Sequence, residues 1–221
     1  MSMVEVAGAH EPGGGRAERK VAANRRWFDR WASRYESGPI SGWLAQIQDA
    51  ALAALELHPD DRLLDVGCGT GAAVRRAADT VREAVGVDVS LGMLTQARSL
   101  ALGLSNVRFV EADSGRLPFQ DEHFTAVLCT TSFHHYPDPA MAVREMARVL
   151  RRGGRALIAD GNADRPAVRA IDRVIRVFEP SHVRVYRLGE LAAFLHGAGF
   201  GKTQVRNLYD GAYVLVKAAK P

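Results

Sequence analysis

Three glycines follow a short apolar segment at alternate positions and stand directly before an expected helix. The segment 63–66 ends at Val66, and the glycines are Gly67, Gly69 and Gly71. Glycine lets the backbone adopt unusual angles and lets a ligand approach the peptide plane. The N–H groups of the helix N-terminus that follows are free to donate. Such a loop binds something flat or negatively charged, although a glycine-rich turn also occurs as a tight connection.

Two acids lie where the next two expected strands end. Asp88 closes the second strand, and an acid about 20 residues beyond a glycine loop is where a ribose diol is held. Asp113 follows the third strand, where it can accept from an adenine amino group. Together with Asp65 these acids predict a nucleoside site at one sheet edge; alternatively, each merely caps a turn.

The charge of the loop distinguishes two nucleoside cofactors. Gly67, Gly69 and Ala72 formally match the dinucleotide fingerprint, but Gly71 comes one position too early for it. Asp65 would be awkward beside a pyrophosphate and favourable beside a cation. S-adenosylmethionine carries an ammonium and a sulfonium and no phosphate, so it is the favoured cofactor. An NAD-dependent oxidoreductase is the alternative, although the chain is short for one with a separate substrate domain.

Two adjacent histidines follow the fourth expected strand, in the segment 130–137. An imidazole with its ordinary pKa near 6.5 suits proton transfer at neutral pH, so His134 or His135 is a candidate general base. The competing interpretation is that the pair orders the loop before Asp138 and Pro139. Two histidines make a poor metal site without a third ligand, so no metal is expected.

The elements that must position these residues alternate between strand and helix. Continuous apolar runs predict strands at 63–66, 84–87, 107–110, 124–129 and 156–159. Helices are expected over 72–80, after a Ser90 cap, and from Asp138 until Gly153 and Gly154 terminate the third. This alternation predicts a doubly wound α/β sheet.

The ends of the chain depart from this rhythm. Residues 1–15 predict a flexible tail, residues 16–57 a helical lid broken at Gly38 and Pro39, and residues 58–221 the main domain. Helical stripes are expected at 168–178 and 188–195. The residues 209–211 then join two apolar runs, 202–208 and 212–217, as an antiparallel hairpin.

Composition excludes several classes of protein. The chain has 221 residues, 47% of them apolar and 24% charged, which fits one ordinary globular domain. It has no apolar run near the ~18 residues of a membrane span, and its first residues do not form a signal peptide. Cys68 and Cys129 are expected to be small buried residues without a disulfide. We therefore expect a cytoplasmic protein without a membrane partner.

A basic excess is concentrated in two segments. The net charge is +4, with seven basic and two acidic residues over 16–34, and nine basic and four acidic residues over 151–187. Mixed runs of this kind are usually solvated helix faces. Because both segments should cap a substrate, they suggest an acidic or phosphate-bearing small molecule. The excess is small for a nucleic-acid partner, which is not expected.

The motifs as a set resemble class I S-adenosylmethionine-dependent methyltransferases, in the small-molecule branch of the ubiquinone and menaquinone C-methyltransferases. The matching segments are Asp65-Val66-Gly67-Cys68-Gly69-Thr70-Gly71, Val87-Asp88-Val89-Ser90-x-x-Met93, Ala112-Asp113-x-x-x-Leu117-Pro118-Phe119 and Arg152-Gly153-Gly154. The resemblance implies a Rossmann-like seven-stranded sheet in the order 3-2-1-4-5-7-6, with the last strand antiparallel. The segment after the fourth strand lacks the Asn-Pro-Pro-Tyr motif of adenine methyltransferases and the acidic pair of magnesium-dependent ones.

The resemblance also implies roles for individual residues. The three glycines would wrap the methionine part, Asp88 would hold the ribose, and Asp113 with Ser114 would bind adenine. Met93 would pack on the adenine ring, and Tyr35 would close over the cofactor. The other cofactor contacts that we expect are Asp65, Cys68, Val89, Thr130 and Thr131.

The substrate should lie under the segments 16–57 and 161–190, with Trp27, Tyr136, Arg184 and Tyr186 as candidate contacts. The expected activity is metal-independent methyl transfer to oxygen, nitrogen or carbon of a small molecule. An RNA methyltransferase and an inactive cofactor-binding module remain as alternatives. The oligomeric state is open, a homodimer included.

Overall fold

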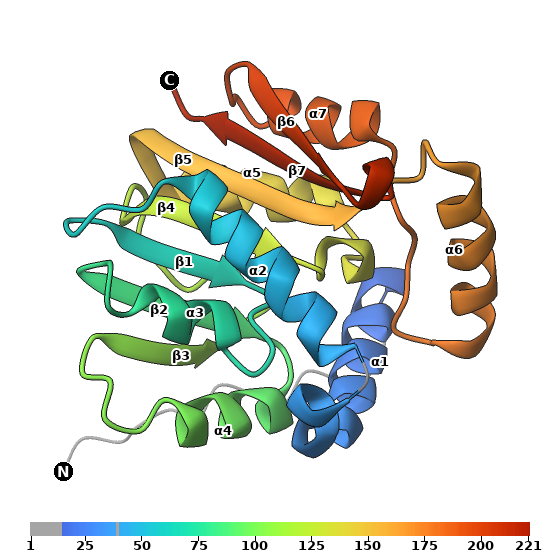
Figure 1. Ribbon diagram of the computed structural model, residues 1–221, viewed down its shortest axis with the longest axis horizontal. Helices are drawn as coiled ribbons and strands as arrows, with labels where there is room; N and C mark the ends of the chain where they lie inside the picture. Colours follow the sequence, from blue (N-terminus) through green and yellow to red (C-terminus); the bar gives the residue numbers. More distant parts are fainter. Residues whose placement is uncertain (1–14, 39) are drawn as a thin grey trace, which may run out of the picture.

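The computed structural model describes residues 15–38 and 40–221, and its centre is a seven-stranded sheet (Figure 1). The strand order is β3-β2-β1-β4-β5-β7-β6, as predicted. The strands are β1 (Arg62–Val66), β2 (Glu83–Asp88), β3 (Val107–Glu111), β4 (Phe124–Thr130), β5 (Leu150–Gly161), β6 (Thr203–Leu208) and β7 (Tyr213–Ala219). The first five strands pair in parallel, whereas β7 is antiparallel to both β5 and β6.

Helices cover both faces of the sheet because successive strand residues point to opposite sides. Leu64 and Val66 belong to a core with α5 (Pro139–Val149) and α7 (Leu188–Gly197). Leu63, on the other face, belongs to a core with α2 (Ser41–Leu55), α3 (Ala72–Ala77) and α4 (Leu91–Leu100). Both cores hold fully buried Val, Leu and Ala side chains, which is why the strands appear as continuous apolar runs.

The remaining helices lie beyond the carboxyl ends of the parallel strands (Figure 1). They are α1 (Arg16–Trp31), the short helix η1 (Ala32–Ser37) and α6 (Pro166–Phe178), while η2 (Phe133–His135) follows β4 directly and η3 (Tyr209–Gly211) joins β6 to β7. In the described part of the chain, no helix is both long enough and apolar enough to cross a membrane. The predicted tail lies outside the described residues except for Gly15, as does Pro39 at the predicted break.

Local caps agree with the predictions at two helix starts. The Ser90 hydroxyl accepts from the Met93 N–H, and Asp138 accepts from the Met141 N–H. The antiparallel hairpin is also confirmed, with Leu208 opposite Tyr213. Both cysteines are buried and free, as expected.

One predicted helix end is wrong. The helix α5 stops at Val149, and β5 begins at the next residue, so Gly153 and Gly154 lie inside the strand rather than at a helix terminus. Gly153 has a positive φ of 74°, and its N–H donates to the Lys220 carbonyl at the end of the chain. The register between β4 and β5 shifts at this point, so the two glycines lie at an irregularity in the sheet. Similarly, α3 ends at Ala77 rather than at residue 80.

Candidate active site

The glycine loop joins β1 to α3, and all three of its glycines have a positive φ. Packing explains two of them. A Cβ on Gly67 would lie 2.4 Å from the Ser132 Oγ, and a Cβ on Gly71 would lie 2.4 Å from the Phe109 ring. Gly69 differs, because the nearest atom to its Cβ position is in Tyr35, 3.9 Å away. The open space in the loop is therefore at Gly69, under the Tyr35 ring.

We expect Gly67→Ala to lower the free energy of unfolding by about 2–5 kcal/mol. The substitution combines the strain of an alanine in the left-handed backbone conformation with overpacking against Ser132. The matched control is Gly69→Ala, which shares the positive φ but has space for its methyl group and should cost about 1–2 kcal/mol. Denaturant unfolding of both variants measures the difference. Equal losses would show that the contact with Ser132 does not constrain the loop.

A cavity lies over this loop at the carboxyl edge of the sheet. It brings together most of the residues predicted to bind the cofactor, namely Tyr35, Gly67, Cys68, Gly69, Asp88, Val89, Met93, Asp113, Ser114, Thr130 and Thr131. Gly71 and Asp65 are not among the lining residues described: Gly71 packs against Phe109, and Asp65 lies buried beneath the loop. Asn24 and Phe28, two residues of α1, also line this cavity and were not among the predicted site residues.

Asp88 fastens the loop to the tip of β2. Its two carboxylate oxygens accept from the backbone N–H groups of Gly69 and Ser90, each at 2.9 Å. Burial raises the pKa of Asp88, and these hydrogen bonds oppose the rise. Since a carboxylate oxygen can accept twice, the same side chain retains acceptor capacity toward the cavity.

Asp65 is a buried carboxylate with an oxygen that lacks a hydrogen-bond partner within the described part of the chain. It is 1% exposed, and its Oδ1 has no hydrogen-bond partner among the described residues. Burial is the main cause and repulsion from Asp88 the second cause that raise the pKa of Asp65 to about 7. A buried carboxylate of this kind is costly unless a cation or a donor is supplied to it.

The edge of the cavity near β3 is built by a turn. The Asp113 Oδ1 accepts from the Gly115 N–H at 2.8 Å, and Ser114 is buried beside it. Asp113 therefore does cap a turn, as the competing interpretation held. It also lines the cavity.

A second cavity of about 810 Å³ adjoins the first and is mainly apolar and aromatic. The two share the lining residues Phe28, Tyr35, Leu44, Thr131 and His135. Thr131 sits at this boundary with a φ of 54°, an unusual conformation for a β-branched residue that occurs at functional sites. The α6 side chains Val168, Ile171 and Ile175 form one wall of the cavity.

The structure sorts the four candidate substrate contacts. Trp27 lines the second cavity. Tyr136 lines the first, and its hydroxyl donates to the Val66 carbonyl at 2.9 Å. Neither cavity has Arg184 or Tyr186 among its described lining residues. Tyr186 packs in the core against Phe133 and Phe194, and Arg184 lies over the Tyr186 ring, so the structure does not bring these two residues to either cavity.

The two histidines of η2 have different surroundings. The His134 Nδ1 lies 2.8 and 3.0 Å from the two oxygens of buried Asp160. Burial lowers the pKa of His134, but the negative charge of Asp160 and the hydrogen bonds to it outweigh that and raise it. Burial also lowers the pKa of His135, in this case well below its ordinary value. His134 is thus the histidine whose environment favours accepting a proton.

The charged side chains that line the second cavity are both basic and acidic. Of its described lining residues, Arg34 is the one arginine, whereas Asp160 and Glu179 are acidic. Arginines from both basic segments are paired within the protein, as in Arg25 with Glu111 and Arg176 with Asp172. Some of the basic residues in these two segments are therefore neutralised by acidic residues of the protein itself.

Comparison with known proteins gives a consistent result. The residues 64–158 match the family model described as a methyltransferase domain. The chain is 37% identical to the uncharacterized methyltransferase YcgJ of Bacillus subtilis, over 77% of this chain and 68% of that protein. It is 32% identical to the demethylmenaquinone methyltransferase of Clavibacter sepedonicus, over 73% and 74%.

Solved structures share the fold at lower identity. The crystal structure of YcgJ superposes with a TM-score of 0.70 at 24% identity, covering 79% of this chain and 98% of that one. A Haemonchus contortus phosphoethanolamine N-methyltransferase, in complex with phosphomonomethylethanolamine and S-adenosylhomocysteine, superposes with a TM-score of 0.74 at 18% identity. That match covers 92% of this chain and 60% of the other.

Proposed function

This chain belongs to the S-adenosylmethionine-dependent methyltransferases, and we propose that it binds S-adenosylmethionine in the first cavity and methylates a small molecule in the second. Similarity to methyltransferases favours this activity over the oxidoreductase that the glycine loop alone leaves open. The observation that carries the proposal is the unpartnered Asp65 carboxylate beneath the loop. A cofactor with an ammonium group and no phosphate matches that charge.

The residues around the first cavity can be assigned to parts of this cofactor. The Gly69 backbone would receive the methionine part, with the charge of Asp65 acting on its ammonium group from beneath the loop. Asp88 would receive the ribose hydroxyls, and Asp113 with Ser114 the adenine amino group. Met93 is 1% exposed and offers an apolar wall to the adenine ring. The cofactor supplies a methyl group already activated on a sulfonium, so the protein contributes mainly placement.

The lid that we propose is α1 with η1. The helix α1 is held by hydrogen bonds to two other parts of the protein, at Ser90 and at His135. Asp29 accepts from the Ser90 hydroxyl at 2.6 Å, and the Asn24 Nδ2 donates to the His135 carbonyl at 3.0 Å. The sequence places the residues of α2 in the predicted lid, but Ile47, Ala51 and Leu55 of this helix are fully buried against the sheet. We therefore place α2 with the core.

The substrate that fits the second cavity is a small molecule with an apolar or aromatic body. Aromatic side chains including Trp27, Trp31 and Trp43 line this cavity, and His134 contributes a polar group on its wall. A substrate whose hydroxyl group reaches His134 would lie next to the boundary at Thr131, where the two cavities meet.

The activity can be tested by screening small molecules for release of the demethylated cofactor, S-adenosylhomocysteine. We expect turnover with aromatic or polycyclic compounds that carry a hydroxyl group, and little with nucleic acid. Turnover with RNA and not with small molecules would contradict the proposal.

We expect Asp88→Ala to weaken binding of S-adenosylmethionine by about 10–150-fold. It removes a charged hydrogen-bond acceptor worth about 1.5–3 kcal/mol and also frees the Gly69 N–H. Isothermal titration calorimetry measures the affinity. The matched control is Asp60→Ala, an exposed aspartate just before β1, which should bind as tightly as the wild type. Unchanged affinity in Asp88→Ala would mean that the ribose is held elsewhere.

A further inference from the structure

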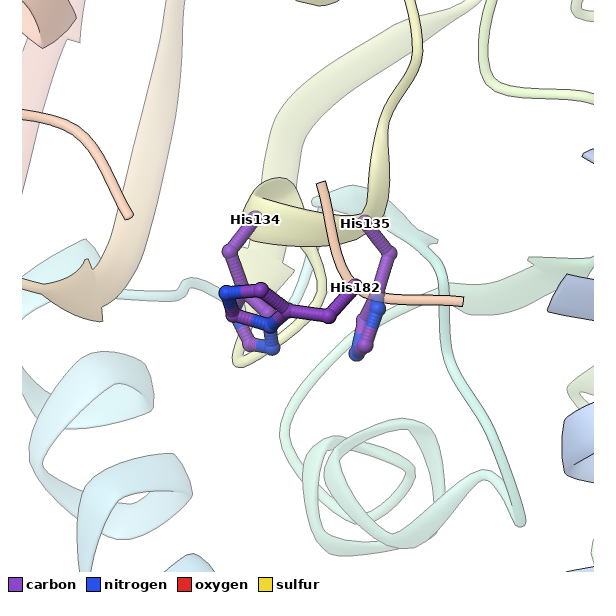
Figure 2. Close-up of side chains that lie close together, drawn as sticks. All are labelled: His134, His135 and His182. Carbon is purple, nitrogen blue, oxygen red and sulfur yellow. The ribbon is translucent and has the colours of Figure 1, made fainter. Parts of the chain in front are cut away.

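Three of the seven histidines of the chain meet at one place (Figure 2). His134 and His135 come from η2, and His182 comes from the connection between α6 and α7. One ring nitrogen of each lies within 4.8 Å of the other two. All three side chains line the second cavity, so the cluster faces the proposed substrate. The sequence supplied only the adjacent pair, and the fold adds the third.

Carboxylates hold two of these rings from behind. Asp160 contacts the His134 Nδ1 at 2.8 and 3.0 Å, and Asp172 contacts the His182 Nε2 at 2.8 Å. Because an ionised carboxylate only accepts, the ring nitrogen facing it carries the proton. The opposite nitrogens, Nε2 of His134 and Nδ1 of His182, then carry the lone pairs. Metal-binding histidines are commonly held by a carboxylate in this way.

His135 supplies an unpartnered nitrogen. Its side chain is 9% exposed, and its Nδ1 is buried without a hydrogen-bond partner among the residues described. Its ring also makes an edge-on contact with the Phe28 ring. A buried polar atom without a partner needs an explanation, and a bound ion is one.

The charges that surround the cluster favour a cation. The carboxylates of Asp160, Asp172 and Glu179 face it, with the Glu179 Oε1 3.8 Å from the His135 Nε2. Two cations lie near these groups: Arg176 pairs with Asp172 at 2.8 Å, and the Lys20 Nζ donates to the carbonyls of Pro180 and His182. With neutral imidazoles, these groups sum to one excess negative charge.

We propose that His134, His135 and His182 form a binding site for a divalent transition-metal ion, with Zn²⁺ as the preferred type. Three imidazoles suit Zn²⁺ and its first-row neighbours, and three protein ligands leave one position of a tetrahedral site open. Zinc–nitrogen bonds of about 2.0–2.1 Å require the ligand nitrogens to lie roughly 3.4 Å apart, so the rings would move inward. This proposal departs from the expectation of a metal-independent enzyme, which rested on the missing third ligand and on the missing acidic pair of magnesium-dependent methyltransferases.

The site would define the substrate class, and this part rests on the proposed function. A cation in the cavity wall lowers the pKa of a hydroxyl group bound to it. In the transfer, the substrate O–H bond breaks and its proton passes to solvent. The oxygen lone pair forms the new C–O bond, and the methyl–sulfur bond breaks with its electron pair going to sulfur. The substrate class is therefore a small molecule with an apolar body and a hydroxyl group, methylated on oxygen.

The site can be tested with Co²⁺ on the full chain without a histidine tag, after removal of bound metals by a chelator. We expect one Co²⁺ per chain with visible ligand-field bands of a tetrahedral nitrogen site, and displacement by Zn²⁺. His182→Ala should abolish the bands. Asp172→Asn keeps all three ligands and should weaken Co²⁺ binding by about 10–100-fold. The control is His58→Ala, an exposed histidine outside the cluster, which should bind as the wild type does.

Binding of S-adenosylmethionine, measured by calorimetry on the same samples, shows that each variant is folded and tests the proposed function separately. If the wild type binds the cofactor but no stoichiometric Co²⁺, the metal site is wrong and the proposed function stands. The same holds if His182→Ala and Asp172→Asn bind Co²⁺ as tightly as wild type. Methyl transfer that is undiminished after metal removal would overturn the role in substrate activation.

Discussion

Replacing Asp65 with asparagine is expected to stabilise the cofactor-free protein and to weaken its binding of S-adenosylmethionine. The carboxylate is buried, lacks a partner on Oδ1, and has a pKa raised to about 7. An increase of about three pKa units corresponds to a cost of up to about 4 kcal/mol for the ionised group at high pH. Asparagine removes that cost and also removes the negative charge that we propose pairs with the ammonium group of the cofactor.

The raised pKa of Asp65 determines how the free energy of unfolding should change with pH. The folded state holds the Asp65 proton up to about pH 7, whereas the unfolded state loses it near pH 4. The Asp65 contribution to the free energy of unfolding is therefore lost as pH rises from about 4 to 7, and Asp65→Asn should become the more stable form over that range. Urea unfolding of both proteins at several pH values measures this. A difference in stability that does not change with pH would contradict the assignment.

Cofactor binding should show the opposite response. As pH falls below 7, Asp65 becomes protonated, and the affinity of the wild type should drop by up to about tenfold per pH unit. The affinity of Asp65→Asn should be about 10–150-fold weaker at high pH, from the loss of a charged partner, and should lack this pH step. Calorimetric titrations at several pH values separate the two proteins.

His134→Ala is expected to lower kcat by about 10²–10⁴-fold while leaving the affinity for S-adenosylmethionine unchanged. The residue lines the second cavity, where we propose that the substrate binds, but not the first, and its ring is held by Asp160. Groups that assist proton removal contribute about this much to catalysis. The loss is expected whether the imidazole takes the proton itself or holds the proposed metal.

Two further variants make this prediction specific. Asp160→Asn keeps the ring in place with a weaker acceptor, so kcat should fall less than in His134→Ala. His196→Ala, at the end of α7 and away from both cavities, is the control and should keep its activity. An undiminished kcat in His134→Ala would remove the histidine from the mechanism. An equal loss in the control would point to a general effect on folding.

The parts of the site that could be predicted are those with a local signal. Asp65, Asp88 and the glycine loop stand at the ends of short apolar runs, and parallel strands bring such ends to one edge. The caps at Ser90 and Asp138 are likewise decided by residues within three positions. Sheet order came from the family resemblance rather than from any local pattern.

The parts that could not be predicted depend on packing between distant segments. Gly71 is required by Phe109, which lies on β3, and Gly67 is required by Ser132. His182 reaches the histidine pair through a connection whose course is fixed by contacts with η2, where the Val183 N–H donates to the His134 carbonyl. Tyr186 is an aromatic residue, and aromatic residues occur both in substrate sites and in protein cores. The residue type alone therefore could not predict that Tyr186 packs in the core.

The most direct test of the assigned function is calorimetry with S-adenosylmethionine, its demethylated product and NADH on the wild-type protein at pH 8, where Asp65 is ionised. We expect one binding site for S-adenosylmethionine, binding of the product at the same site, and no binding of NADH. Clear binding of NADH without binding of either sulfur compound would contradict it.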